Sequence, residues 1–324
     1  MAKQQQSLRR LDHRDISWYI DRLVQILMFM GGISAIVFII SIFIFIAKEG
    51  VGFIGDEFSL SEFFGSINWR PTSETNETYG ALALMVGTAS ITGMAMLIAI
   101  PFSLGAAIYI GEFATGKTRE TLKILVELLA AIPSVVWGFI GLTIMNGIII
   151  DLFDLPIGLN VLNAGVILGL MAAPIMTTIA EDALKAVPEK YREAAEAMGA
   201  TRWQVIWRVV IPASKNGLVS AVLLGIGRGF GETMAVLMAS GHSINIPGSA
   251  FDSVRALTAT IAAELGETAV GSSHYGALFT LGIFLFLGVP IAYSLGLSSF
   301  LYFLLYHPEL LSILPQRLYA GTDS

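Results

Sequence analysis

Long apolar blocks separated by polar segments dominate this sequence. We place six such blocks at residues 24–47, 80–110, 121–149, 161–183, 216–240 and 276–306. Each block is long enough to cross a hydrocarbon layer of roughly 30 Å as a helix. Inside lipid the backbone must satisfy its own hydrogen bonds, so helix is the expected form of every block. The pattern therefore predicts an all-α membrane protein with six transmembrane helices.

The same pattern divides the chain into three parts. Residues 1–23 form an N-terminal segment, residues 24–306 the six-helix transmembrane domain, and residues 307–324 a C-terminal tail. Composition agrees, because 14% of the residues are charged against roughly 25% in an ordinary soluble domain. The absence of cysteine excludes thiol catalysis, disulfides and thiolate metal sites. His242 and His274 lack metal-ligand spacing, and we expect neither a metal nor a cofactor.

The lysines and arginines predict the orientation of the helices. Five precede the first block, three follow the second, six follow the fourth and one lies in the tail, whereas the opposite side carries only Lys48, Arg70 and Arg255. Fifteen against three is a clear bias, and the side richer in basic residues is the cytoplasmic side. Both termini are therefore expected in the cytoplasm, as an even number of spans also requires.

The polar segment after the fourth block, residues 184–215, predicts two short helices. Pro188 suits the first position of a helix, and Gly199 suits a left-handed stop. Thr201 then opens a second helix, with Gln204 placed for a capping box. The apolar positions of this second helix form one stripe: Trp203, Ile206, Trp207 and Val210. A helix pair of this kind at the inner surface predicts a docking element, although an interfacial pair without a partner has the same pattern.

The spacing of Ala195, Gly199 and Val205 also fits a helix-turn-helix. A DNA-reading helix of that motif presents polar side chains at its start. Here Trp203 and Ile206 occupy those positions, and the helix ends run into membrane spans. We therefore expect no nucleic acid partner.

The loop also carries a family resemblance. Its sequence contains Glu193-Ala194-Ala195, then Gly199, and closes on Val209-Val210-Ile211-Pro212. This arrangement resembles the EAA loop of bacterial ABC importer permeases, whose pattern ends Ile-x-Leu-Pro. The resemblance implies a type I ABC importer permease fold and a coupling helix that docks on a separate ATPase chain. The residues that match the coupling motif are Glu193, Ala194, Ala195, Gly199 and Pro212.

Residues 111–118, GEFATGKT, match the phosphate-binding loop pattern GxxxxGK[ST]. That loop requires a buried strand before it and a helix after it in a soluble α/β domain. Here one apolar span precedes the match and another follows closely, so we interpret Lys117, Arg119 and Lys123 as inner-surface charges. Glu127, one turn after Lys123, is expected to pair with it. A nucleotide-binding membrane protein remains an alternative hypothesis.

Two opposite charges lie in the middle of the fifth block. Arg228 and Glu232 are one helical turn apart, so they share a face of a continuous helix. An unpaired arginine at that depth costs at least ~2.5–3.5 kcal/mol, so it is expected to face a cavity or a protein partner. Gly227 and Gly231 are spaced for close helix approach. The surrounding residues complete the candidate path: Gly225, Gly227, Gly229, Gly231 and Thr233.

Two hypotheses account for this charge pair. In the first, the fork of Arg228 binds two oxygens of a tetrahedral anion, and Glu232 holds Arg228 when the path is empty. In the second, Arg228 and Glu232 form a permanent ion pair that fixes helix register in the bundle or across a dimer.

A more specific resemblance covers residues from about 65 to 305. The segments GIGRGFGETMAVLMASG, LTATIAAELGE and HYGALFTLGIFLF resemble the Pst phosphate-importer permeases, specifically their C-subunit branch, as do NWRPTSE and YGALALMVGTA. LTATIAAEL, residues 257–265, is itself expected to form a short outer helix. Many family members have alanine-isoleucine after the arginine, where this chain has Gly229-Phe230.

This resemblance implies a multi-pass permease subunit of the bacterial inner membrane that imports inorganic phosphate by alternating access and is not an enzyme. It implies a heterodimer with a homologous six-helix permease, a cytoplasmic ATPase dimer and an extracytoplasmic phosphate-binding protein. Sulfate, molybdate or phosphonate as the cargo, and a passive channel, remain alternatives.

Overall fold

The computed structural model describes residues 16–56, 59–73 and 76–288, and its architecture is helical. Five helices in this part are long and apolar enough to span a membrane: Trp18–Ile54, Leu82–Phe113, Ser134–Phe153, Val161–Lys185 and Arg202–Gly231. A shorter apolar helix, Ser273–Phe286, begins the sixth predicted span. The rest of that span lies outside the described residues, as do the tail 307–324 and most of the segment 1–23.

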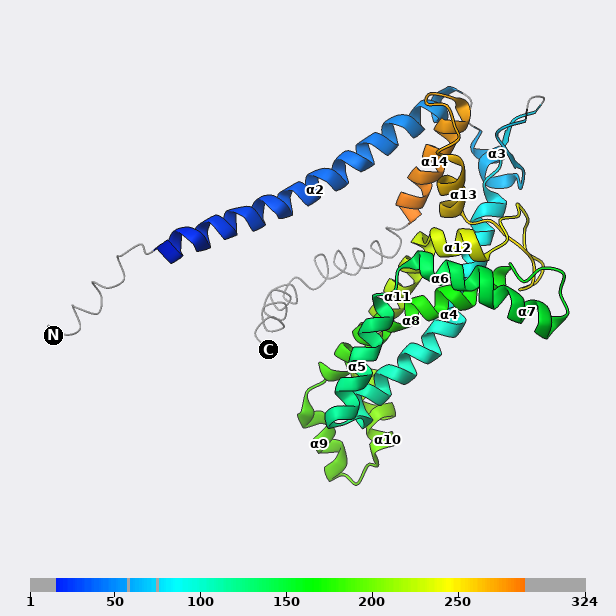
Figure 1. Ribbon diagram of the computed structural model, residues 1–324. Helices are drawn as coiled ribbons and strands as arrows, with labels where there is room; N and C mark the ends of the chain where they lie inside the picture. Colours follow the sequence, from blue (N-terminus) through cyan, green and yellow to red (C-terminus); the bar gives the residue numbers. More distant parts are fainter. Residues whose placement is uncertain (1–15, 57–58, 74–75, 289–324) are drawn as a thin grey trace.

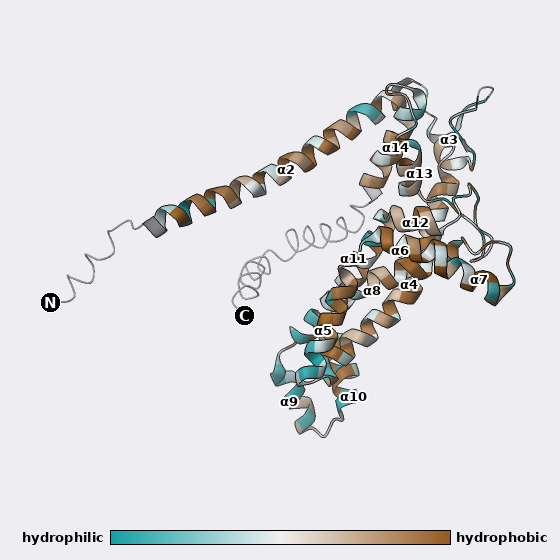
Figure 2. Ribbon diagram, viewed as in Figure 1, coloured by the Kyte–Doolittle hydropathy of each residue, from teal (hydrophilic) through white to brown (hydrophobic). Residues whose placement is uncertain are grey.

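Helix α2 (Ile16–Asp56) extends away from the other helices (Figure 1). It contacts α14 (Ser273–Gly288) near its own C-terminal end, where the Thr280 hydroxyl donates to the Gly50 carbonyl at 3.2 Å. No residue of its most apolar stretch is buried within the described chain, and most of its ribbon has the brown colour of hydrophobic residues (Figure 2). A helix that is apolar on every side needs lipid or another chain around it.

The core lies between α4 (Leu82–Ile108) and α8 (Val161–Lys185), with α11 (Ile211–Gly231) packed along α8. The two central helices approach closely: a Cβ on Gly169 of α8 would lie 2.9 Å from the carbonyl oxygen of Ala95 in α4. Fully buried Ile91 and Leu168 fill the space between these helices. Such burial of apolar side chains against close backbones gives the bundle its rigid centre.

The third predicted span begins later than expected. Helix α5 (Gly116–Ala130) ends before Pro133, and the chain resumes as α6 (Ser134–Ile140), a π-helix η3 (Gly141–Met145) and α7 (Asn146–Phe153). Pro133 is extended, at φ −60° and ψ 144°, and proline disfavours the helical conformation in the residue before it. The span is therefore 134–153, and α5 is a separate amphipathic helix with no buried residue.

One end of the bundle carries α3 (Leu60–Gly65), a hairpin of β1 (Trp69–Arg70) and β2 (Thr78–Tyr79), and α13 (Leu257–Glu264). The strands are antiparallel, with Trp69 opposite Tyr79. The short helix expected over residues 257–265 is confirmed. Glu264 of α13 links these elements. Its carboxylate accepts a hydrogen bond from the indole N–H of Trp69 at 2.9 Å and contacts Arg255 and His274.

The opposite end carries the polar loops after the second and fourth spans (Figure 1). These are the π-helix η2 (Tyr109–Phe113), α5, α9 (Glu189–Ala197), α10 (Arg202–Val205) and a second π-helix, η4 (Ile206–Val210), which continues into α11. The loops that carry most basic residues in the described chain therefore share one end, as the predicted orientation requires.

Candidate functional site

The fifth apolar block is broken beside its buried charges. Helix α11 ends at Gly231, Glu232 is extended at φ −71° and ψ 132°, and α12 (Met234–Ala239) starts two residues later. The expectation of one continuous helix over 216–240 is therefore wrong. Arg228 lies in the last turn of α11, whereas Glu232 lies outside that helix, so the two side chains do not share a helical face.

Arg228 and Glu232 have different surroundings. The Glu232 carboxylate accepts a hydrogen bond from the backbone N–H of Ala235 at 3.3 Å, as a capping residue of α12 does. Arg228 is half-buried, and its Nε atom is fully buried with no hydrogen-bond partner among the described residues. In that part of the chain no ion pair joins Arg228 to Glu232. A buried N–H without an acceptor is costly, so this guanidinium is suited to a ligand or to a group from another chain.

The glycines of α11 that contact neighbouring helices are not the ones that the sequence predicted. A Cβ on Gly225 would clash with Met176 of α8, and a Cβ on Gly229 would lie 2.9 Å from Thr92 of α4. Gly227 and Gly231, which we expected at the close contact, have open space on that side. Residues two apart point in nearly opposite directions on a helix. Gly225 and Gly229 therefore face the bundle, and Gly227 and Gly231 face away from it.

Contacts with α13 hold the break after α11. Thr258 of α13 donates its hydroxyl to the carbonyl oxygen of Glu232 at 2.6 Å, and the backbone N–H of Leu257 donates to Thr88 of α4 at 3.0 Å. Thr233 makes a local contact, donating to the Gly231 carbonyl at 3.3 Å. Thr88 and Thr258 lie in segments that carry the family resemblance, but sequence reasoning missed their contacts, because no local pattern shows which distant residue a threonine will bind.

The paired helices of the 184–215 loop are confirmed in their local signals. Gly199 is left-handed at φ +81°, and Thr201 and Gln204 form the capping box. Pro188 precedes the first helical residue of α9 as its N-cap, one position earlier than expected.

The predicted apolar stripe of the second helix is divided between two directions. Ile206 and Val210 are buried against the bundle, whereas Trp203 and Trp207 are 56% and 61% exposed. The two tryptophans line one side of an apolar groove of about 510 Å³, whose other side comes from α4 and η2. The expectation of a single continuous stripe is wrong, because Ile206 and Val210 face the bundle whereas the two tryptophans face the groove.

The residues of the coupling motif lie on and beside α9. Glu193 and Ala194 are exposed, whereas Ala195 is half-buried against the cluster of apolar residues that includes Leu184. Pro212 is exposed in the first turn of α11. The structure therefore leaves one face of α9 open and holds the other against the bundle.

Two groups of ion pairs near α9 and α5 were missed from the sequence. Glu181 is 2% exposed and contacts Lys123 at 3.2 Å, Arg119 at 3.4 Å and also Lys185. Lys123 therefore pairs with Glu181 of α8 in place of the predicted Glu127. Arg192 of α9 contacts Glu112 of η2 at 2.9 Å. Residues 62 and 80 positions apart meet here, and helix-spacing rules cannot detect such pairs.

Residues 111–118 do not have the geometry of a phosphate-binding loop. The π-helix η2 precedes Gly116, where a buried strand is required, and Lys117 is exposed. In the described part of the chain the only strands are β1 and β2, which have two residues each and lie at the opposite end of the bundle from Lys117.

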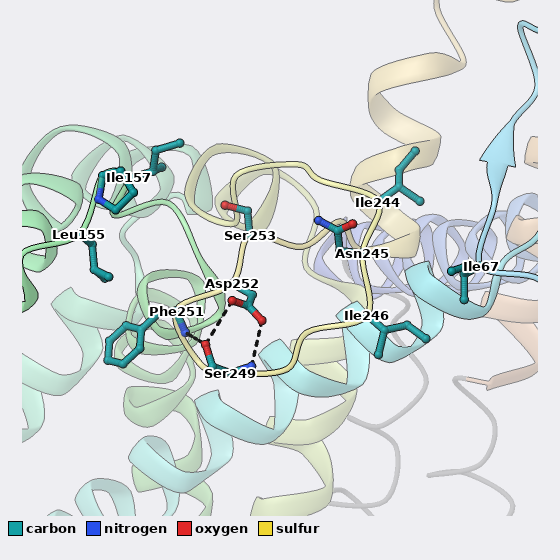
Figure 3. Close-up of a pocket in the computed structure, with 11 residues that line it drawn as sticks. Ile67, Leu155, Ile157, Ile244, Asn245, Ile246, Ser249, Phe251, Asp252 and Ser253 are labelled. Carbon is teal, nitrogen blue, oxygen red and sulfur yellow. Dashed lines mark hydrogen bonds between the residues drawn. The ribbon is translucent and has the colours of Figure 1, made fainter.

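A hollow of about 890 Å³ lies between residues 155–157 and the loop 244–253 (Figure 3). Asp252 organises the loop, because its carboxylate accepts from the backbone N–H groups of Gly248 and Ser249 at 2.7 and 2.9 Å. These bonds hold the pKa of Asp252 below its ordinary value. Ile157 and Ile246, both about half exposed, give the hollow an apolar rim.

Comparison with known proteins identifies the family. A sequence profile described as "Binding-protein-dependent transport system inner membrane component" matches residues 99–295. The chain belongs to this family of permeases. The expected class, a membrane transport permease and not an enzyme, is thereby confirmed.

Relatives of this permease share about a third of its residues. The "Probable ABC transporter permease protein YqgH" of Bacillus subtilis is 37% identical over 76% of this chain and 80% of its own length. The "Phosphate transport system permease protein PstC" of Haemophilus influenzae is 34% identical, covering 72% and 80%. The protein of the same name from Mesorhizobium japonicum is 36% identical, covering 69% and 73%.

Solved structures support the permease fold. A bacterial alginate ABC transporter, in complex with a periplasmic protein, matches with a TM-score of 0.58 at 17% identity, over 86% of this chain and 94% of that chain. The MetNI methionine ABC transporter, in an inward-facing conformation, matches with a TM-score of 0.52 at 20% identity, over 66% and 91%. The predicted type I ABC importer permease fold is confirmed.

Proposed function

We propose that this permease carries inorganic phosphate inward across the bacterial inner membrane by alternating access, as one subunit of an ATP-driven importer. One observation carries the proposal: Arg228 lies beside a helix break in the bundle with a buried, unpartnered Nε atom. Its chain is 34% identical to a named phosphate transport permease over 72% of its length. A lone guanidinium inside a membrane bundle is a functional group by default.

The proposed chemistry is binding without covalent change. A guanidinium fork matches two oxygens of a tetrahedral anion, and charge-assisted hydrogen bonds of this kind are strong in a dry site. Gly227 and Gly231 keep the side of α11 away from the bundle free of bulk, while Gly225 and Gly229 keep the helix against α4 and α8. Thr233 follows the end of α11 and completes the proposed path. Glu232 caps α12 here, and in the empty state that follows release it holds Arg228.

Energy enters the permease from a separate ATPase dimer. The open face of α9, with Glu193 and Ala194 exposed and Met198 88% exposed, is the surface proposed to dock on it. Small Ala194 permits close approach, and Glu193 offers a carboxylate to a basic partner. In this arrangement the α9 end faces the cytoplasm and so do both termini.

Two further partners fit unoccupied surfaces of the described chain. The unburied apolar length of α2 suits a homologous six-helix permease subunit and the surrounding bilayer. The hollow ordered by Asp252 at the opposite end suits an extracytoplasmic phosphate-binding protein, which would insert an apolar side chain between Ile157 and Ile246.

Uptake of labelled phosphate by the reconstituted importer tests the proposal. Arg228→Ala is expected to abolish uptake while the complex still assembles, and Arg228→Lys, the matched variant that keeps the charge, is expected to retain part of it. Full transport by Arg228→Ala would refute the assignment.

The same assay separates the alternatives. Strong inhibition by excess sulfate would favour another oxyanion as the cargo, and uptake without the ATPase would favour a passive channel. If Arg228 and Glu232 only fix helix register, the double alanine variant would restore transport that either single variant loses.

A further inference from the structure

Helix α9 has one held face and one open face. Its open face carries Glu193 and Ala194 and continues to Met198 directly after the helix, whereas Arg192 and Ala195 turn toward the bundle. Arg192 and Ala195 are three positions apart, so they share one side of the helix. A docking helix can transmit a displacement only if the face that packs on the bundle is fixed to the transmembrane helices that must move.

Arg192 is the most connected side chain on that held face. Its guanidinium donates to the carboxylate of Glu112 at 2.9 Å and to the carbonyl oxygen of Leu184 at 2.9 Å. It also donates to the carbonyl of Val187, in the turn between α8 and α9. The side chains of Arg192 and Glu112 are 13% and 12% exposed. One arginine therefore joins α9 both to the end of α8 and to η2.

The partner carboxylate lies in a π-helical turn at the end of the second span. Glu112 belongs to η2, the π-helical turn that ends the span begun by α4. Single π turns inside helices occur frequently at functional sites. Glu112 is also the acidic residue inside the 111–118 segment, whose phosphate-binding geometry the fold excludes. α4 in turn packs along α8 and contacts Gly229 of α11 through Thr92.

We propose that Arg192 and Glu112 are positioning residues for transport: they form the joint through which a push on α9 reaches α4, and through it the break beside Arg228. The proposal rests on the docking of α9 on the ATPase. It assigns to Arg192 a role that the coupling motif does not include, because its side chain faces the bundle and not the partner. Without this joint, a movement of the ATPase would bend the turn around Val187 and would not displace α4.

The first test measures phosphate moved per ATP hydrolysed by the complete reconstituted importer. Glu112→Gln removes the negative charge of the pair and keeps the size of the side chain. Arg192→Ala removes the guanidinium and with it the whole joint. Each is expected to lower the ratio about fivefold or more, with the ATPase still bound and active. Arg202→Ala, which changes an exposed arginine of the same loop, is the matched control and should leave the ratio unchanged.

An unchanged ratio in Glu112→Gln overturns the joint. Loss of the ATPase from Glu112→Gln during purification also overturns it, because the pair would then shape the docking surface. Failure of the docking proposal is separate: Glu193→Ala and Gly199→Ala would keep both the ATPase and its stimulation. Should Arg192→Ala not assemble, Glu112→Gln decides alone.

The second test measures rigidity directly. The chain has no cysteine, so spin labels can be placed on two introduced cysteines, at Tyr191 in α9 and at Leu97 in α4, which are 52% and 73% exposed. A label at Tyr191 leaves the proposed docking surface unmodified. In the complete importer the distance distribution between the labels on Tyr191 and Leu97 is expected to be narrow, and to broaden in Glu112→Gln. A distribution of equal width in both would overturn the joint, since a merely stabilising pair leaves the geometry of the folded state unchanged.

Discussion

Thr258 donates its hydroxyl to the backbone carbonyl of Glu232 at 2.6 Å, at the break between α11 and α12. Carbonyl groups at the end of a helix have no partner within it, and a buried one needs another donor. Thr258 supplies that donor from α13, and α13 is itself attached to α4 through Thr88. The break beside Arg228 is therefore maintained by tertiary contacts.

Replacing Thr258 with valine keeps its shape and removes the hydroxyl. The carbonyl of Glu232 then loses its partner, which we expect to cost about 1–3 kcal/mol of folding free energy. Thermal unfolding of the purified permease measures this loss, and phosphate uptake should fall because the break is less well defined. Thr260→Val is the matched control, since the Thr260 hydroxyl makes a local bond, donating to the carbonyl of the N-cap residue Ala256 at 2.9 Å. Equal effects of the two variants would contradict the role given to Thr258.

Signals that act within a few residues were sufficient to predict part of this structure. The helix pair of the 184–215 loop follows from Gly199, Thr201 and Gln204, which stop one helix and cap the next. The five long described spans follow from block length and hydropathy. The start of the third span was misplaced although Pro133 carried the signal.

The remaining features depend on residues far apart in the chain. The break after Gly231 is held by Thr258, and the joint at Arg192 is made with Glu112, 26 and 80 positions away. A lone threonine or glutamate has no local pattern that identifies such a partner. The register of the glycines was missed for the same reason, because only packing shows that Gly225 and Gly229, and not Gly227 and Gly231, face the bundle.

Alanine at Gly229 and at Gly227 should have opposite effects on stability. A Cβ at Gly229 would lie 2.9 Å from the methyl carbon of Thr92, a buried β-branched side chain with little freedom to move. We expect overpacking to cost about 1–3 kcal/mol. At Gly227 the added Cβ meets open space, and alanine favours a helix over glycine by about 1 kcal/mol. Thermal unfolding of both variants in one detergent checks this order; greater damage at Gly227 would show that the packing register is wrong.

Alanine at Gly199 should weaken coupling through backbone strain. The residue is at φ +81°, and its Cβ would meet no neighbouring atom, so conformation alone sets the cost. We expect alanine to destabilise the left-handed turn by about 1–2 kcal/mol. The backbone then relaxes, and α9 tilts relative to α10. ATPase stimulation by the assembled importer should fall for Gly199→Ala and be largely restored in Gly199→Asn, because asparagine tolerates this region. Equal activity of both variants would contradict the strain argument.

His242 should make the stability of the permease depend on pH. Burial, with a smaller contribution from the nearby Arg255, lowers the pKa of His242 from 6.5 to about 4. Between these values the unfolded chain binds more protons than the folded one, so stability is fully present above pH 6.5 and is lost as pH falls toward 4. His242→Asn removes the titration and suits the residue's φ of +54°. Unfolding temperatures measured between pH 7 and 4, a range that spans both pKa values, should therefore fall less steeply for the variant; parallel curves would show that folding does not lower the pKa of His242.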